Sequence, residues 1–360
     1  MALDSYVSLG HSGLKVSPFC LGAMNFGEDG GMGCGVEESQ KILQTYLDRG
    51  GNFVDTANFY TNGHSEKIIG DFFAQRPGLR DRVVLATKFF CNLHLGDPNG
   101  GGAGRKAILG QVEDSLRRLR TDYIDLYWLH NYDWSTPVEE TLRTLDDLVT
   151  AGKIRYVGFS DTPAWFTAKA HTMALLRDWT PITALQMEYS LLERTIEGEL
   201  IPLAQDAGMG VLPWSPLKSG YLSGTYVRGN GIPAGTRRSA VLGVPSEAQF
   251  EVIDALAAVA EEAGASSAAV ALAWVQNRPG VTSTIIGPRR LDHLEANLAG
   301  LEVRLTEEQT ALLDEVSTPT LNFPAELNRR VAPMLKYSGA TVDGQKTSAY
   351  PPLLESTTRY

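Results

Sequence analysis

Short apolar runs, typical of buried strands, alternate with longer amphipathic segments along most of the chain. The pattern predicts strands at Phe19–Met24, Asn52–Asp55, Val83–Lys88, Tyr123–His130, Ile154–Ser160, Ala184–Glu188, Gly210–Trp214 and Thr284–Ile286, and after them helices at 36–49, 65–75, 105–120, 137–151, 163–177, 197–207, 246–263 and 291–299. Uninterrupted strand–helix units with right-handed crossovers favour a closed parallel barrel over an open sheet. We therefore predict an α/β fold, a (β/α)8 TIM barrel, as a single domain over residues 1–360.

Several segments lie outside this repeat. The runs Tyr6–Leu9 and Leu14–Ser17 flank a Gly-His-Ser-Gly turn and predict an N-terminal β-hairpin that plugs one end of the barrel. Extra helices are expected at 266–277 and 306–316, and long glycine-rich loops at 25–36, 89–104 and 215–245 should rise from the carboxyl face. The barrel core then covers about residues 6–316, and the tail 317–360 either folds over the active site or is partly disordered.

Composition excludes several partners. With a formal net charge of −10, a pI near 5.2 and no basic run, neither nucleic acid nor an anionic membrane is expected to bind. The sequence contains no apolar run of transmembrane length and no signal-peptide pattern at its start, and its three cysteines, Cys20, Cys34 and Cys91, suit a reducing cytoplasm. The histidines show no HxH or HExxH spacing, so no metal site is predicted.

Polar residues stand at the ends of consecutive predicted strands. Asp55 ends the second strand, Lys88 the third and His130 the fourth, and Tyr60 follows Asp55 in a turn-rich loop. The carboxyl ends of barrel strands share one mouth, so these residues, here named the tetrad, are expected to meet there. Taken singly, each has an ordinary structural explanation, such as helix capping by Asp55 or a hydrogen-bonded core histidine.

As a set, these residues suggest acid–base chemistry. A free tyrosine titrates near 10, so a phenol acting as general acid at neutral pH gains from an adjacent ammonium that stabilises the developing phenolate. Asp55 can hold Lys88 in place and charged, while a neutral His130 can donate or relay a hydrogen bond to a substrate oxygen.

These motifs resemble the aldo-keto reductase family over most of the chain. The matching segments are Asn52–Ala57 with Tyr60, Gly63–Glu66, Thr87-Lys88 and Asp125–His130. The resemblance implies that Tyr60 is the proton donor, that Lys88 and Asp55 tune it, and that His130 orients the carbonyl. It also implies NADPH as the hydride source, without a metal.

The second half of the chain supplies the cofactor site that the resemblance implies. The hydroxyl and amide groups at Ser160, Asp161 and Gln186 suit a nicotinamide carboxamide, and the face of Trp214 can cover one side of the ring. Family members often carry Asn at the position of Asp161, and they often carry Glu where this chain has Ala296. The run after Trp214 resembles the pyrophosphate-holding segment of the family, and arginines at the start of the last barrel helix favour NADP(H) over NAD(H). The predicted cofactor-binding residues are Met24, Asp55, Ser160, Asp161, Gln186, Trp214, Ser215, Leu217, Lys218, Gly287, Arg289, His293 and Asn297.

The predicted substrate pocket is an apolar wall with one amide, which suits a bulky hydrophobic or sugar-like aldehyde or ketone, or the corresponding alcohol. Its predicted lining residues are Phe26, Phe59, Phe90 and Asn131, with Met24 beside them.

Other functions stay open at this point. Gly102–Ala107 formally fits a GxGxxA dinucleotide motif, but it lies too far from the preceding strand to form a tight strand-to-helix turn. A nicotinamide-sensing regulatory subunit of the same fold would bind cofactor with little turnover, whereas a barrel lyase or isomerase using the same acid and base would bind none. Oligomeric state is not indicated.

Overall fold

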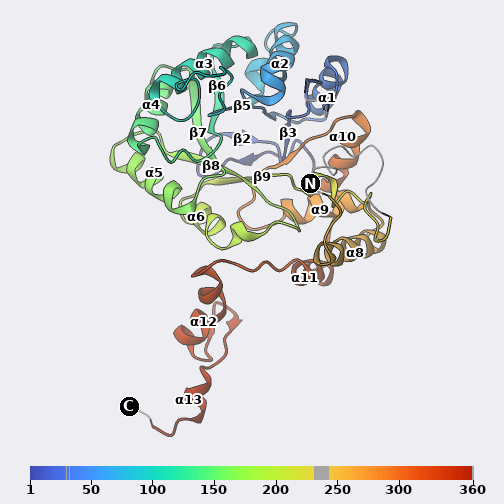
Figure 1. Cartoon of the computed structure of the whole chain (residues 1–360). Helices are drawn as coiled ribbons and strands as arrows, with labels where there is room; N and C mark the ends of the chain where they lie inside the picture. The colour runs from blue at the N-terminus through green and yellow to red at the C-terminus, as the bar shows by residue number, and fades with distance from the viewer. Residues whose placement is uncertain (30, 32, 231–242, 359–360) are drawn as a thin grey trace.

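A parallel barrel forms the centre of the computed structural model, which describes residues 1–29, 31, 33–230 and 243–358 (Figure 1). Within the described residues its sheet has eight parallel strands, in the order β10 (Thr284–Ile286), β3 (Phe19–Gly22), β4 (Phe53–Asp55), β5 (Val84–Phe89), β6 (Ile124–Leu129), β7 (Ile154–Ser160), β8 (Ile182–Glu188) and β9 (Gly210–Trp214). The amide of Thr282, just before β10, donates to the carbonyl of Val211 in β9 at 2.9 Å, which brings the two ends of the sheet together. The predicted fold class is confirmed.

Helices surround the barrel and alternate with its strands (Figure 1). They are α1 (Val36–Asp48), α2 (His64–Ala74), α3 (Arg105–Leu119), α4 (Val138–Thr150), α5 (Ala164–Leu176), α6 (Leu200–Asp206), α8 (Glu247–Glu262), α9 (Ser267–Gln276), α10 (Leu291–Leu298) and α11 (Glu307–Val316). In the described part of the chain, no single helix is long and apolar enough to cross a membrane, and α8 with α9 would meet that test only as a pair bent by 98°.

Two layers of apolar side chains hold this architecture together. Inside the barrel, alternate strand residues such as Phe53, Ala86, Leu126 and Trp128 pack into a closed core, and the other face of each strand packs against the helices. Because strands buried on both faces need apolar residues throughout, the apolar runs were readable from the sequence.

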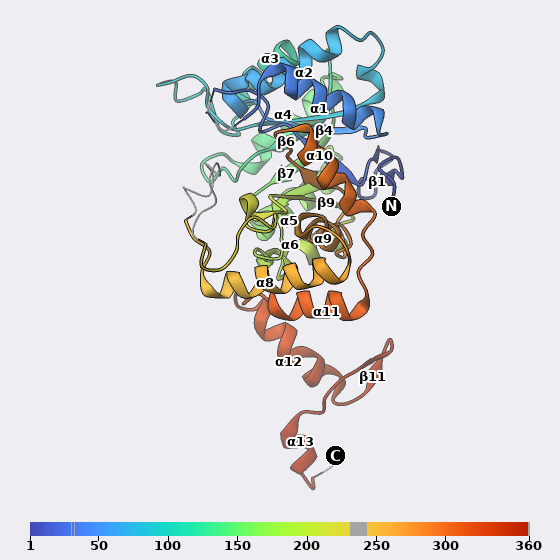
Figure 2. The same cartoon turned by 90° about the vertical axis from the view of Figure 1, so that its right-hand side faces the viewer.

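The predicted hairpin is present as β1 (Val7–Ser8) paired antiparallel with β2 (Lys15–Val16). Its Leu9 and Val16 are fully buried and join the interior core of the barrel, so the hairpin closes the amino end. The site must therefore form at the opposite, carboxyl end. The predicted loop 89–104 projects there, whereas residues 30, 32 and 231–242 of the other two predicted loops lie outside the described residues (Figure 2).

The tail after α11 has short secondary-structure elements of its own. It contains α12 (Ala325–Tyr337), a small hairpin of β11 (Thr341–Val342) and β12 (Gln345–Lys346), and α13 (Pro351–Glu355). Figures 1 and 2 show that it leaves beside α11 and extends away from the barrel, so the described tail does not cover the carboxyl mouth.

Candidate active site

Backbone hydrogen bonds continue beyond the ends of the strands and position the tetrad residues next to one another. After β4, the amide of Thr56 donates to Ala86 and that of Asn58 to Lys88, so the segment after Asp55 continues along β5. Lys88 lies beside Trp128 in the β5–β6 register, and the amide of His130 donates to Phe89 at 3.1 Å. The structure thus brings three strand ends to one place, as predicted.

Lys88 is the centre of the polar contacts. Its side chain is fully buried, and its ammonium donates to the Asp55 carboxylate, to the Thr56 carbonyl at 2.9 Å and to the Tyr60 hydroxyl at 3.3 Å. The Gln186 amide donates to the second Asp55 oxygen at 3.2 Å. An ammonium has three hydrogens, and here each one has an acceptor, so its position is fully specified.

Burial and neighbouring charges shift the pKa values of Lys88 and Tyr60 in opposite directions. Burial lowers the pKa of Lys88, but the neighbouring Asp55 and Tyr60 outweigh it, and the pKa ends above its ordinary value. Burial also raises the pKa of Tyr60, and the Lys88 ammonium only limits that rise. The phenol therefore keeps its proton across the physiological range and faces a permanent cation, as a general acid should.

His130 completes the tetrad in its neutral form. Burial, assisted by the charge of Lys88, lowers the pKa of His130 to about 2. Its ring meets that of Tyr60 edge-on with centroids 5.8 Å apart, and the Phe59 ring lies 5.3 Å away. Its buried Nδ1 has no hydrogen-bond partner among the described residues. An uncharged ring with spare hydrogen-bonding capacity is suited to a neutral ligand oxygen.

The turn that carries Tyr60 is pinned by hydroxyl groups. Thr61, in left-handed backbone conformation with φ 48°, donates through Oγ1 to the Phe26 carbonyl at 2.7 Å. Ser65 is buried and bonds to the Thr56 hydroxyl and the Ala23 carbonyl, both at 2.8 Å. These positioning residues were not predicted, although Ser65 belongs to the Gly63–Glu66 motif.

The predicted nicotinamide groups lie around the same mouth. Ser160 is buried and its hydroxyl makes no well-aligned hydrogen bond to the described residues, while Trp214 is half-buried. The Trp214 indole N–H donates to the Asp161 carboxylate at 3.0 Å, and partial desolvation raises the pKa of Asp161 to about 6. Gln186 is already engaged with Asp55, so it is less available than the sequence indicated.

In the segment after Trp214, two residues have a left-handed backbone conformation, and the lysine is paired with carboxylates. Ser215 and Lys218 have φ of 52° and 44°, and Leu217 packs against the core. The Lys218 ammonium donates to Glu188 at 2.7 Å and lies 3.8 Å from Glu193. A phosphate at this lysine would have to compete with two carboxylates.

At the start of α10, where phosphate binding was predicted, one of the candidate donor groups already has a partner within the chain. Among the described residues Arg289 has no hydrogen-bond or ion-pair partner, but the first helical amide, Leu291 N–H, donates to Glu38 at 2.8 Å. Gly287 accepts from the Asn25 amide at 2.8 Å. His293 is half-buried and Asn297 is buried on the same helix.

The residues predicted to line the substrate pocket differ in their exposure. Phe26 is fully buried in the core between barrel and helices, so its assignment to the pocket is wrong, and its carbonyl accepts a hydrogen bond from the Thr61 hydroxyl. Phe59, Asn131 and Met24 are exposed and Phe90 is half-buried. A pocket of about 440 Å³ adjoins the site instead at Asp161 and Trp214. Its other lining residues, which sequence reasoning missed, are Tyr132, Thr162, Pro163, Met187, Glu188, Glu193, Thr195, Ile196 and Leu200.

Among the described residues, no group of three or more His, Cys, Asp or Glu side chains is arranged so that it could hold a metal ion.

Comparison with known proteins agrees with this geometry. The model of the Aldo/keto reductase family matches residues 18–318. An "Uncharacterized oxidoreductase YrpG" of Bacillus subtilis is 38% identical over 86% of this chain and 95% of its own length. An "Aryl-alcohol dehydrogenase [NADP(+)]" of Phanerodontia chrysosporium is 35% identical over 87% and 85%, and a "Norsolorinic acid reductase" of Aspergillus flavus is 34% identical over 87% and 81%. The chain belongs to the aldo/keto reductase family and is an oxidoreductase of that family.

Proposed function

We propose that the protein is an NADPH-dependent oxidoreductase that interconverts an aldehyde or ketone and the corresponding alcohol, with Tyr60 as the general acid and base. The observation that carries the proposal is the buried ammonium of Lys88, which contacts both the Tyr60 phenol and the Asp55 carboxylate. An ion pair with a purely structural role would not require a phenol in contact with the ammonium.

The residues around the mouth fit a nicotinamide cofactor. The buried Ser160 hydroxyl lacks a well-aligned partner in the described structure, Trp214 offers a half-buried aromatic face, and Arg289 is a cation without a described partner. Ser160, Asp161 and Trp214 would hold the nicotinamide, while Lys218, Arg289 and His293 would hold phosphates. When bound, the reduced cofactor supplies the hydride.

The protein side chains then transfer the proton. In the reducing direction, Tyr60 gives its hydroxyl proton to the substrate oxygen, and the Lys88 ammonium at 3.3 Å stabilises the phenolate that forms. Asp55 and the Thr56 carbonyl keep this ammonium in place, and neutral His130 orients the same substrate oxygen. In the oxidising direction, the phenolate takes the alcohol proton back.

An aryl alcohol or aldehyde is the substrate class that we propose. The pocket beside Trp214 has a largely apolar wall that includes Tyr132, Met187 and Ile196, which suits an aromatic ring. One relative is named for aryl alcohols and another for reduction of norsolorinic acid. The acidic charge and three free cysteines support a cytoplasmic location.

The test measures cofactor binding and turnover separately. Titration with NADPH should quench tryptophan fluorescence, and a panel of benzaldehydes and aryl ketones should show steady NADPH consumption. Absence of nicotinamide binding would refute the reductase and favour a lyase or isomerase. Tight NADPH binding with turnover slower than about one event per minute on the whole panel would favour the sensor instead.

A further inference from the structure

The pocket of about 440 Å³ beside Trp214 lies next to the tetrad and contains none of the tetrad residues. Its lining residues come from β8, β9, the start of α6 and the loops after β6, β7 and β8, and neither Tyr60 nor His130 is among them. Asp161 links the two places, because it accepts the Trp214 indole N–H and its pKa responds to the Lys88 ammonium. A ligand group that fills this pocket is therefore a neighbour of the reacting carbonyl, and not that carbonyl itself.

The volume of the pocket is large enough for a ring in addition to the reacting group. If each ring carbon is allowed the roughly 30 Å³ that a water molecule has in the liquid, a phenyl ring needs at most about 180 Å³. The pocket of about 440 Å³ exceeds this, and it falls within the range of small-molecule sites. A one-ring aldehyde whose oxygen meets Tyr60 would therefore leave most of this space unfilled.

The walls of this space suit a flat apolar group. The apolar side chains that line it on three elements and two loops are Tyr132, Pro163, Met187, Ile196, Leu200 and Trp214. Tyr132 is held in place, because its ring packs edge-on against the rings of Phe166 and Trp165, with centroids 4.8 and 5.9 Å away. Trp214 is held by its hydrogen bond to Asp161. A ligand ring in this space can meet both aromatic side chains in edge-on or offset contacts.

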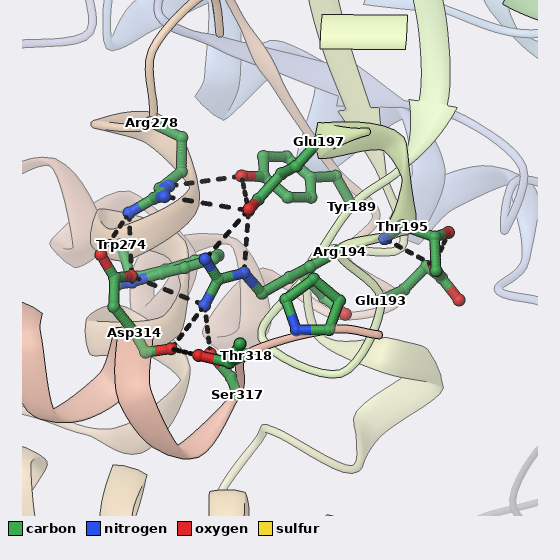
Figure 3. Close-up of polar contacts among 12 residues, drawn as sticks. Tyr189, Glu193, Arg194, Thr195, Glu197, Trp274, Arg278, Asp314, Ser317 and Thr318 are labelled. Atoms are coloured by element: carbon green, nitrogen blue, oxygen red, sulfur yellow. Dashed lines mark hydrogen bonds and ion pairs between the residues drawn. The ribbon is translucent and has the colours of Figure 1, made fainter. Parts of the chain in front are cut away.

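One wall of the pocket, the loop after β8 that carries Glu193 and Ile196, is fixed from behind. Figure 3 shows Arg194, the residue after Glu193, reaching the end of α11. Arg194 is buried, and its guanidinium donates to the Asp314 carbonyl at 2.9 Å and to the Ser317 hydroxyl at 2.7 Å. Because this loop is anchored to the surrounding helices, the pocket is formed before any ligand arrives, as small-molecule sites usually are.

Every charged residue that lines the described pocket is acidic. The three are Asp161, Glu188 and Glu193. The Lys218 ammonium donates to Glu188 at 2.7 Å and lies 3.8 Å from Glu193, so the carboxylates outnumber the cation beside them. An anionic ligand group would lose its water next to charges of the same sign, which disfavours it strongly relative to a neutral group of the same shape.

We propose that the protein prefers uncharged aryl aldehydes and ketones that carry a second aromatic ring, and that this ring occupies the pocket while the carbonyl meets Tyr60. The inference rests on the proposed reductase function and adds to it which molecules are reduced. Contacts made by a remote part of a substrate contribute to kcat/KM. A second ring removes apolar surface of both the ligand and the pocket from water, so it should raise kcat/KM at least about tenfold.

Initial rates of NADPH oxidation by the full-length wild type test the proposal with four aldehydes. At least one of 2-naphthaldehyde and 4-phenylbenzaldehyde should exceed benzaldehyde about tenfold or more in kcat/KM, and 6-carboxy-2-naphthaldehyde should fall about tenfold or more below its neutral methyl ester. Equal or lower values for both two-ring aldehydes overturn the second-ring site, and equal values for acid and ester overturn the charge selection. No NADPH consumption with any aldehyde would refute the proposed function itself.

A variant that fills the pocket tests where the second ring lies. Ile196→Trp should lower the two-ring to one-ring ratio of kcat/KM about tenfold or more, because the larger side chain takes up the space. Leu312→Trp, at an exposed position of α11, is the matched control and should keep the wild-type ratio. An unchanged ratio in Ile196→Trp overturns the assignment to this pocket. Circular dichroism checks that the variants are folded, and the wild-type aldehyde series stands without them.

Discussion

Replacing Lys88 with methionine removes the one cation that joins the buried carboxylate to the phenol. Methionine fills similar volume, so the change tests charge more than packing. Breaking a buried ion pair costs about 3–5 kcal/mol because the remaining charge is left uncompensated. The lower value, about 3 kcal/mol of unfolding free energy, is expected here because Asp55 keeps the Gln186 hydrogen bond and can take up a proton.

The pH dependence of this loss of unfolding free energy follows from the pKa of Asp55. Burial raises the pKa of Asp55 and Lys88 opposes that rise, so removing Lys88 raises it further. A folded-state pKa above the unfolded value gives stability that is complete below the unfolded pKa and is lost as pH rises through the folded pKa. The destabilisation of Lys88→Met should therefore be smallest near pH 4 and grow as pH rises.

Urea unfolding of four proteins measures the effect: wild type, Lys88→Met, Asp55→Asn and the double variant. The double variant has no buried charge and should be less destabilised than the sum of the single variants by about 1–3 kcal/mol. Lys41→Met, on an exposed residue of α1, should change stability by less than about 0.5 kcal/mol. If Lys88→Met is as stable as wild type at pH 8, Lys88 does not pair with Asp55 in the way described.

Three further predictions concern the cofactor. Asp161 has a pKa near 6, so once ionised it should favour the cationic ring of NADP⁺. The affinity for NADP⁺ relative to NADPH, measured by fluorescence titration, should therefore rise several-fold between pH 5 and 8. The same pH dependence in Asp161→Asn would contradict this. Glu38→Gln removes a carboxylate from the α10 amide and should strengthen NADPH binding about three- to tenfold, with NADH unaffected; weaker NADPH binding would place the phosphate elsewhere. Trp214→Leu should weaken cofactor binding roughly tenfold and remove most of the fluorescence quenching, whereas Trp134→Leu, exposed on a loop, should do neither.

The fold was predictable because its signals are local. Alternating apolar and amphipathic runs gave the strands and helices to within a few residues, and parallel topology then placed Asp55, Lys88 and His130 at one mouth. The hairpin plug was predictable for the same reason, since Leu9 and Val16 flank a clear turn.

What escaped prediction depends on side-chain pairing across distant segments. Phe26 was predicted to line the pocket, but its side chain lies in the core, and its carbonyl accepts a hydrogen bond from Thr61, 35 residues later. The partners of Lys218 and of the α10 amide are carboxylates on other elements, and their spacing gives no signal. The tail carries a helical apolar stripe in its sequence, which could have revealed α12, but nothing in it specifies direction.

The central claim is that the Tyr60 phenol transfers the proton to a carbonyl oxygen, and substitution by phenylalanine tests it most directly. For reduction of an aryl aldehyde, Tyr60→Phe should lower kcat about 10²- to 10⁴-fold while the dissociation constant for NADPH changes less than about threefold. Tyr6→Phe, at an exposed residue just before β1, should change neither. An undiminished kcat in Tyr60→Phe would contradict the account.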